Sequence, residues 1–250
     1  MITRKSRHEI SLMRTAGSIV AEALNEMKAA VKPGISTAEL DEIAYNIIIK
    51  NHAIPTFKGY HGFPASICSS INEQVVHGIP GRDIILKEGD IISLDVGATY
   101  RGLVGDSAIT VPVGAVGPEI EKLMEVTNQA LYDAIEKMTA NTSLNDVSGA
   151  IEDQANKHGF GIVKSYGGHG VGRSMHEDPF VFNYRNSISG IILKSGMTIA
   201  IEPMFNLGTG DVHTLEDNWT VVTNDNKPSA HFEHTVLVTD EAPEILTLGN

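Results

Sequence analysis

The 250-residue sequence predicts an α+β fold in which two similar halves each pack two helices on an antiparallel sheet. Two observations predict it. The predicted elements run in the order two helices, strands, two helices and strands again. In addition, a shift of 107 residues places Gly89–Asp95 on Gly196–Glu202, glycine on glycine and acid on acid. We therefore expect a single domain over 1–250, built from an internal repeat of about 1–112 and 113–250.

Four helices are predicted from capping patterns and hydrophobic periodicity. Ser6 with Glu9, and Ser36 with Glu39, form capping boxes ahead of apolar residues at helical spacing. Pro118 suits the first position of a third helix, because the N–H that it lacks would have no helical partner there. A fourth helix follows the polar sequence NTSLND and ends at the next His-Gly pair. The β-branched segments that remain are predicted strands: 90–98, 103–114, 196–205, 218–224 and 230–240.

Composition and charge exclude several functional classes. The net charge of −12 argues against a nucleic-acid partner, because phosphate contacts need clustered Lys and Arg. The single cysteine, Cys68, rules out an intramolecular disulfide and suits a reducing cytoplasm. No apolar stretch has the length of a signal-peptide core or of a membrane span. We expect a cytoplasmic, monomeric globular protein with no membrane partner.

An acidic hairpin is the first candidate site. The stretch LDVGATYRGLVGD predicts a strand, a turn and a second strand. If the bend is centred on Tyr100 and Arg101, Asp95 lies directly opposite Asp106. Two partly buried carboxylates at such a short separation need a shared proton or a cation between them. A different register, which sends one or both aspartates to solvent, remains the alternative for this hairpin taken alone.

The repeat supplies two further acids. Glu202 takes the place of Asp95 in the second half, and Glu233 takes the place of Asp106. Two hairpins packed about a pseudo-twofold axis would bring four carboxylates to one centre, and two divalent ions would balance their charge. Paired metal ions bridged by carboxylates are a recurring hydrolytic device. An oxygen-rich ligand set favours manganese or iron(II), with cobalt as a substitute in vitro.

Histidines near the glycine-rich stretch GGHGVGRSMHEDP complete the candidate set. His169 and His176 are seven residues apart, so on one regular strand they would face opposite ways, and we expect two distinct roles. His77 precedes a Gly-x-Pro turn and could project into the same cleft. Ordinary surface or core positions are expected for His8, His52, His158 and His213.

Five stretches, in order and with compatible spacing, resemble the type I methionine aminopeptidases over nearly the whole chain. They are GYHGFPASICSSINEQVVHGIPG, LDVGATYRGLVGDSA, GGHGVGRSMHEDP, IAIEPMF and DNWTVVTNDNKPSAHFEHTVLVT. The resemblance implies the pita-bread (creatinase/aminopeptidase) fold, with two pseudo-symmetric halves. It also implies metal-dependent removal of the N-terminal methionine from peptides and nascent proteins, with a small second residue preferred.

The resemblance further implies roles for individual residues. Two divalent ions per chain (cobalt, manganese, iron(II) or zinc) would be held by Asp95, Asp106, His169, Glu202 and Glu233, with Asp106 and Glu233 as bridges. Glu202 would also act as general base. His77 and His176 would contact the substrate beside the scissile bond, where His176 and the ions stabilise the oxyanion. The methionine pocket would comprise Tyr60, Phe63, Cys68 and Trp219, with Phe57 and Met175 as walls.

Several alternatives remain beside this interpretation. Cys68 as a nucleophile is disfavoured because the residues around it supply no committed base, and Trp219 could be a core residue. Met175 departs from the family pattern, since the position before the second histidine is often aromatic, and a flexible thioether there could loosen the preference for methionine. The rival functions are an Xaa-Pro aminopeptidase or prolidase of the same fold, a metal-free pita-bread protein that binds a partner such as the ribosome, and an unrelated amidase.

Overall fold

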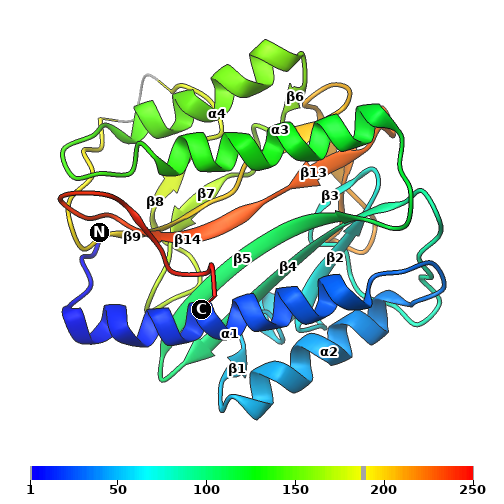
Figure 1. Cartoon of the computed structure of the whole chain (residues 1–250), viewed down its shortest axis with the longest axis horizontal. Helices are drawn as coiled ribbons and strands as arrows, with labels where there is room; N and C mark the ends of the chain where they lie inside the picture. Colours follow the sequence, from blue (N-terminus) through cyan, green and yellow to red (C-terminus); the bar gives the residue numbers. More distant parts are fainter. Residues whose placement is uncertain (1, 187–189, 250) are drawn as a thin grey trace.

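The computed structural model describes residues 2–186 and 190–249, and it places two helix pairs on one face of a central sheet (Figure 1). The first pair is α1 (Arg7–Ala30) with α2 (Thr37–Lys50), and the second is α3 (Pro118–Ile135) with α4 (Leu144–His158). The four predicted helices are thus confirmed. Among the described helices, none combines the length and the apolar character that a membrane span requires.

The helix ends follow from the predicted caps. The side chains of Ser6 and Ser36 each accept a hydrogen bond from the backbone N–H of the glutamate three residues on, and each glutamate side chain accepts one from the N-cap N–H. Pro118 occupies the first turn of α3. Helix α4 begins after Ser143 and ends at Gly159, which adopts the left-handed conformation that favours glycine.

The main sheet has nine strands among the described residues, in the order β1-β4-β5-β14-β9-β7-β8, with β2 also paired to β4 and β15 to β14. Its strands are β1 (Ile54–Pro55), β2 (Ile67–Ile71), β4 (Ile91–Tyr100), β5 (Leu103–Pro112), β7 (Gly168–Gly170), β8 (Glu177–Val181), β9 (Thr198–Ile201), β14 (Glu233–Leu237) and β15 (Glu244–Ile245). Two three-stranded sheets contain β3 (Gln74–Val76), β6 (Gly161–Ile162), β10 (Met204–Asn206), β11 (Val212–Thr214), β12 (Val221–Thr223) and β13 (Ser229–His231).

The predicted register of the acidic hairpin is wrong by two residues. Tyr100 pairs with Leu103, so the turn is at Arg101 and Gly102 rather than at Tyr100 and Arg101. Both turn residues have positive φ, 49° and 82°, as a two-residue type I′ turn requires. Asp95 therefore pairs with Ala108, and Asp106 with Gly97. The two aspartates still share a face of the sheet, but as diagonal rather than direct neighbours.

Corresponding positions of the two halves have corresponding local structure. An isolated bridge joins Ser36 to Ile85 in the first half, and one at the same offset joins Ser143 to Ile192 in the second. The N–H of Leu86 and of Leu193 each donate a 2.9 Å backbone hydrogen bond to the equivalent carbonyl, that of Ile35 or Thr142. These matched features support a proposal that 1–112 and 113–250 are copies of one unit.

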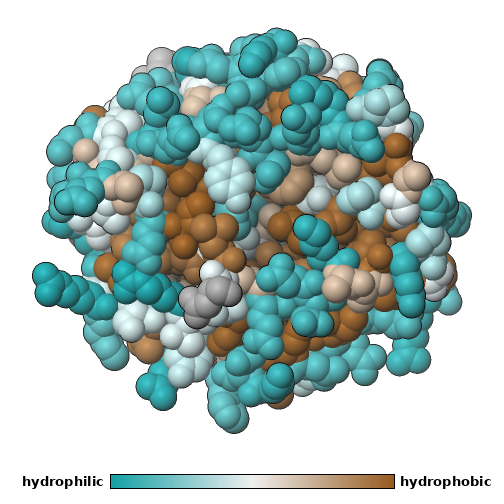
Figure 2. All heavy atoms as spheres, viewed as in Figure 1, coloured by the Kyte–Doolittle hydropathy of each residue, from teal (hydrophilic) through white to brown (hydrophobic). Residues whose placement is uncertain are grey.

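Each half has its own apolar core between its helices and the sheet. Helices α1 and α2 cover residues of β4 such as Leu94 and Val96, whereas α3 and α4 cover residues of β9 and β14 such as Ile199 and Val236. Figure 2 shows hydrophilic side chains over the outer faces of both helix pairs, with hydrophobic ones gathered between them. The opposite face of the sheet is left for the functional groups.

Candidate active site

A cavity of about 470 Å³ lies on the sheet face that the helices leave free. Strand alternation explains its position. Leu94 and Val96 of β4 enter the core beneath α1 and α2, so Asp95 between them projects to the other face. Asp95 lines the cavity, and so does Asp106 from the neighbouring strand β5. The hairpin of β4 and β5 thus contributes apolar side chains to the first core on one face and two acids to the cavity on the other.

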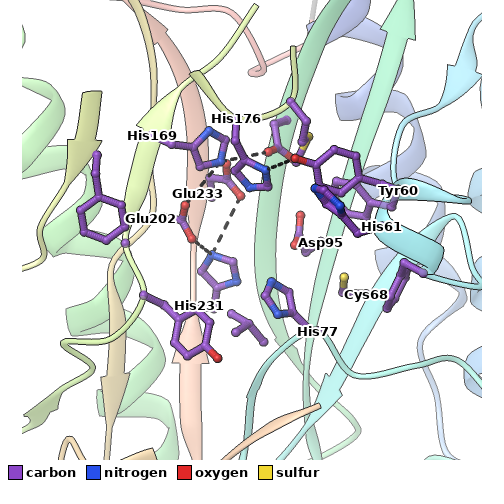
Figure 3. A pocket seen from close by; sticks show the side chains of 18 of the residues that line it. Tyr60, His61, Cys68, His77, Asp95, His169, His176, Glu202, His231 and Glu233 are labelled. Atoms are coloured by element: carbon purple, nitrogen blue, oxygen red, sulfur yellow. Dashed lines mark hydrogen bonds and ion pairs between the residues drawn. The ribbon is translucent and has the colours of Figure 1, made fainter. Parts of the chain in front are cut away.

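The second half contributes the other two acids from adjacent strands. Glu233 begins β14, which pairs with β5 on one side and with β9 on the other. Glu202 directly follows β9. Asp106 and Glu233 are almost completely buried, with exposed fractions of 1% and 2%, whereas Asp95 and Glu202 keep partial access to the cavity. Figure 3 shows Asp95 on one side of the cavity and Glu202 with Glu233 on the other.

Two histidines lie against these acids. The Nε2 of His169, on β7, is 3.7 Å from Asp106 Oδ2 and 3.6 Å from Glu202 Oε1. Its Nδ1 is 2.9 Å from the carbonyl oxygen of Gly170, to which the ring N–H donates, so the Nε2 lone pair faces the carboxylates. The Nε2 of His231 is 3.7 Å from Glu202 Oε2 and 3.9 Å from Glu233 Oε2. A neutral imidazole aimed at carboxylates is suited to sharing a cation with them.

The four acids repel one another when ionised, so the metal-free site favours bound protons and the ionised site favours a cation. Burial raises the pKa of Asp106 to about 7, and burial together with the neighbouring acids raises the pKa values of Asp95, Glu202 and Glu233 well above the usual range. Burial, together with the nearby His176, also lowers the pKa of His169 to about 4, so this imidazole supplies no compensating charge near neutral pH.

Unpartnered polar atoms point to the same need. Within the described residues, four buried atoms at this centre have no hydrogen-bond partner: Asp95 Oδ1, Asp106 Oδ1, Glu233 Oε1 and His231 Nε2. Ligand atoms of Asp106, His169 and Glu233 all lie within 4.8 Å of one another, and these three residues could hold a metal ion. Buried acceptors without donors are costly, and a cation would satisfy them. The donor set therefore fits a divalent metal centre.

The other side of the cavity is apolar and aromatic. Phe63 and Trp219 pack edge to face with ring centroids 5.1 Å apart, and the ring centroids of His77 and Trp219 are 6.3 Å apart. Cys68 of β2 is the strand partner of Asp95. Burial and the neighbouring carboxylates raise the pKa of its thiol well above the usual range, so the thiol stays protonated. A protonated thiol argues against nucleophilic catalysis by Cys68.

The structure brings all thirteen predicted site residues to this one cavity. It also places there several residues that the sequence analysis did not assign, among them His61, His231 and Phe180. The spacing of His231 and Glu233, two residues apart in a strand-rich segment, was the available signal, because such residues share a face. His61 and Phe180 carried no comparable signal. The individual roles of the thirteen residues remain predictions.

The buried carboxylate–histidine cluster is suited to a metal ion, and the match to a family model places the chain in a class of protein, the metallopeptidases. The sequence matches metallopeptidase family M24 over residues 11–240, and the chain belongs to this family. A divalent metal requirement follows from that membership and agrees with the buried carboxylate–histidine cluster.

Within the family, the chain is similar to methionine aminopeptidases along its whole length. It is 49% identical over 248 residues to the methionine aminopeptidase of Clostridium acetobutylicum and 50% identical over 247 residues to methionine aminopeptidase 1 of Bacillus subtilis, with 99% of each chain covered. The crystal structure of methionine aminopeptidase from Thermotoga maritima superposes with a TM-score of 0.97 at 44% identity and covers 99% of both chains.

More distant structures share the fold alone. An Xaa-Pro dipeptidase from Bacillus anthracis has a TM-score of 0.79 at 21% identity, and the match covers 99% of this chain and 62% of that one. The predicted pita-bread fold is confirmed by these likenesses.

Proposed function

We propose that this protein removes the N-terminal methionine from peptides and nascent proteins, with a small second residue preferred. One observation carries the proposal above all. Four carboxylates, three of them with an unsatisfied buried oxygen, converge beside an apolar aromatic pocket, in a chain about half identical to methionine aminopeptidases over its full length. The acids supply a hydrolytic metal centre, and the pocket supplies room for an apolar first side chain.

Five residues would hold two divalent ions: Asp95, Asp106, His169, Glu202 and Glu233. The charge balance supports two, because the four carboxylates carry four negative charges once they are deprotonated and His169 is neutral. When bound, the ions would polarise the scissile carbonyl and acidify water. Oxygen-rich ligation makes manganese, iron(II), cobalt or zinc the candidates.

We assign the proton transfer to Glu202. Its carboxylate lies between the two imidazoles, with Oε1 near His169 and Oε2 near His231, and it keeps access to the cavity. Burial and the charges of Asp106 and Asp95 raise its pKa in the metal-free protein, and bound cations would keep the carboxylate deprotonated and able to accept a proton. Glu202 would accept the proton of the attacking water at a carboxylate oxygen and pass it to the leaving amine.

His176 would act on the scissile carbonyl. Its Nδ1 lies 2.7 Å from the hydroxyl of Tyr60, and its pKa is lowered by burial and by His61, which favours the neutral ring. With the Tyr60 hydroxyl donating to Nδ1, the ring proton is on Nε2. That N–H would donate to the carbonyl oxygen as negative charge develops there. His77, whose pKa is lowered to about 4 by burial and by His176, would contact the substrate as a neutral group.

The first side chain of the substrate would enter the aromatic part of the cavity. Phe63 and Trp219 present ring edges and faces there, and Cys68 and Met175 add sulfur atoms. A methionine thioether makes favourable contacts with aromatic rings, and an apolar pocket offers no partner for a polar side chain. Specificity for methionine follows from this lining.

The cellular setting belongs to the same proposal. A substrate that is the N-terminus of a nascent chain implies work in the cytoplasm, as a monomer and in transient association with the ribosome. The net charge of −12 makes a protein surface rather than RNA the contact on such a particle.

The test compares peptides on one metal-loaded preparation. Metal-free protein given manganese or cobalt should release methionine from Met-Ala-Ser far faster than it releases leucine from Leu-Ala-Ser or any residue from Xaa-Pro peptides. Glu202→Gln should lower the turnover of Met-Ala-Ser by roughly 10²–10⁴-fold, the contribution of a positioned general base. Glu26→Gln, at an exposed position of α1, is the matched control and should leave turnover unchanged.

Two results would overturn the proposal. A preference for Xaa-Pro peptides would favour the prolidase alternative. Retained turnover in Glu202→Gln, with near-UV and far-UV circular dichroism unchanged, would remove Glu202 from its role.

A further inference from the structure

The edge of the main sheet carries an aromatic side chain next to the metal centre. Strand β8 is the last strand in the order of the main sheet as described, and it pairs only with β7 there. In that pairing Phe180 lies directly opposite His169. Residues opposite each other on antiparallel strands project to the same face. His169 points into the cavity (Figure 3), so Phe180 projects to the same side, and it lines the same cavity.

Phe180 begins a row of three rings. Val181, the last residue of β8, is buried in the core beneath α3 and α4, so Phe180 before it projects to the other face, and Phe182 and Tyr184 follow after the strand ends. The ring centroids of Phe180 and Phe182 are 4.8 Å apart, and those of Phe182 and Tyr184 are 5.3 Å apart, both packed edge to face. The ammonium of Lys164 lies 5.4 Å from the centroid of the Tyr184 ring. We call Phe180, Phe182 and Tyr184 the aromatic ridge.

The first ring of the ridge is held in place although it is open to solvent. Phe180 has an exposed fraction of 44%. A Cβ on Gly167, another residue of the cavity lining, would lie 3.1 Å from Phe180 Cζ, so the ring tip rests against this glycine. Single exposed apolar residues are normal on protein surfaces. Three rings in contact, starting inside a catalytic cavity and leading away from it, form a continuous apolar surface that a ligand can cover.

The order of the strands places this surface on the path of a substrate. The apolar pocket is at the β2 end of the sheet, where Cys68 lies, and the acids follow on β4, β5, β14 and after β9. A peptide with its first side chain in the pocket and its first peptide bond at the acids therefore continues toward β7 and β8.

Distance fixes which substrate residues reach the ridge. Neighbouring strands are about 4.8 Å apart, so β8 is about 10 Å beyond β9, the strand that Glu202 follows. An extended chain advances about 3.3–3.6 Å per residue, so the third or fourth residue of a substrate arrives at β8.

We propose that the aromatic ridge is an extended substrate subsite, which binds the third and fourth residues of the substrate and favours apolar or aromatic side chains there. The inference rests on the proposed function, because it takes the acids as the site of cleavage. Substrates would then be selected first by their N-terminal side chain in the methionine pocket and second by their third and fourth residues at the aromatic ridge. Nascent chains with the same first two residues would then be processed at different rates according to the residues that follow.

The test uses two peptides that differ only beyond the second residue. With manganese-loaded protein, kcat/KM should be about tenfold higher for Met-Ala-Phe-Phe-amide than for Met-Ala-Gly-Gly-amide, the size of effect expected for one or two aromatic contacts. Phe180→Ser should reduce this ratio to about one, whereas Phe180→Leu should retain much of it. Tyr184→Ser should reduce the ratio to a smaller extent, because Tyr184 is the farthest ring from the metal centre.

Tyr45→Ser is the matched control for Tyr184→Ser. Tyr45 lies on α2, is partly buried like Tyr184, and packs beneath the ammonium of Lys58 at 4.6 Å. Its loss should leave the ratio of the two peptides unchanged. Thermal unfolding of each variant checks that the sheet edge persists.

The possible outcomes separate the ridge from the proposed function. A ratio of about one in the unsubstituted protein, or a ratio that Phe180→Ser leaves intact, overturns the subsite while methionine release from both peptides continues. Failure to release methionine from either peptide would instead overturn the proposed function.

Discussion

The two halves of the protein deliver acids to one centre by different routes. In the first half, one continuous hairpin of β4 and β5 carries both Asp95 and Asp106, and only a two-residue turn separates the strands. In the second half, Glu202 follows β9 and Glu233 begins β14, and these strands also pair. Strands β10 to β13 lie between them in the chain. The acidic positions correspond, but the connection differs.

The difference separates the acids that both halves supply from the recognition groups that only one connection supplies. All residues between the two acids of the tight hairpin belong to its paired strands or its two-residue turn, so this connection adds no further segment to the cavity. The longer connection of the second half brings His231 and Trp219 to the cavity. The corresponding pairs of acids would hold the ions, and the segment that lacks a counterpart would add an imidazole and a pocket wall.

The largest expected effect is on metal binding, which should differ between the acids predicted to bridge both ions and the acid predicted to bind one ion. Asp106→Asn and Glu233→Gln, one in each half, should each abolish tight binding of both ions, whereas Asp95→Asn should leave one ion bound. Activity should fall more than about a hundredfold in all three variants. Mutation of a residue that merely hydrogen-bonds to a metal ligand already lowers metal affinity or activity roughly 10–100-fold. Metal content after dialysis, measured by mass spectrometry, distinguishes the two classes. Equal metal loss in all three variants would contradict the bridging roles.

The second expected effect is a pH dependence of stability in the metal-free protein. Asp106 has its pKa raised by burial from 3.8 to about 7, so the folded protein binds this proton more tightly than the unfolded chain does. The stability that this group contributes is fully present below pH 4 and is lost as the pH rises through about 7. Thermal unfolding in a chelator should therefore show a fall in stability across this window, and Asp106→Asn should reduce the fall.

Metal addition provides the complementary measurement. Ions bind the deprotonated carboxylates, so manganese should raise the unfolding temperature more at pH 8 than at pH 5. The same increase at both pH values would argue against metal binding by these acids.

The third prediction concerns two ion pairs that join the halves. Lys5 Nζ lies 2.6 Å from Glu177 Oε2, and the side chains are only 1% and 12% exposed. Glu177 Oε1 also accepts the backbone N–H of Arg173 and of Ser174, just before His176. Lys5→Met leaves this carboxylate without its cation and should lower the free energy of unfolding by about 3 kcal/mol. It should also lower kcat, because the loop that positions His176 loses its anchor.

The matched comparison is a pair on the surface. Arg14 and Glu244 also join the halves, at 2.6 Å, but their side chains are 51% and 38% exposed. Arg14→Met should change stability by about 0–1 kcal/mol, because solvent screens exposed pairs, and should leave kcat unchanged. Equal losses in the two variants would show that burial does not distinguish these pairs.

The smallest expected effect is on selectivity. Met175 is buried among Phe57, Phe63 and other residues of the pocket cluster. Met175→Phe replaces a flexible thioether by a rigid ring. The change should raise the ratio of Met-Ala-Ser to Leu-Ala-Ser turnover about threefold. As a free energy, this effect is smaller than the ~1–3 kcal/mol by which one methylene is discriminated in a hydrophobic pocket. A lower ratio would indicate that the thioether is itself the better partner for methionine.

Sequence patterns predicted what local chemistry determines. The capping boxes at Ser6 and Ser36 located two helix starts, because both partners of a box lie within one turn. The repeat predicted convergence of the four acids, which the structure brings to one cavity. The hairpin register was wrong because Arg101, a residue that does not ordinarily adopt positive φ, occupies the first turn position.

Long-range pairings were beyond sequence reasoning. Phe180 lies opposite His169 only because β7 and β8 pair across a bulge, and no periodicity in the intervening glycine-rich stretch marks that register. His231 approaches Glu202 because β13 pairs with β10 and places His231 opposite Met204, a long-range pairing that composition does not reveal. The acids could be found by analogy between the halves, whereas the position of Phe180 opposite His169 depends on a strand pairing that only the structure shows.

The pairing of β5 with β14 has a consequence for how the protein is made. The Ser107 hydroxyl donates to the carbonyl of Glu233, and 126 residues separate the two along the chain. Contacts of such high sequence separation close large loops and are formed late in folding. A chain synthesised only through its first half thus has two of the five predicted ligands, and tight uptake of a cation would be a sensitive reporter that the polypeptide has finished folding.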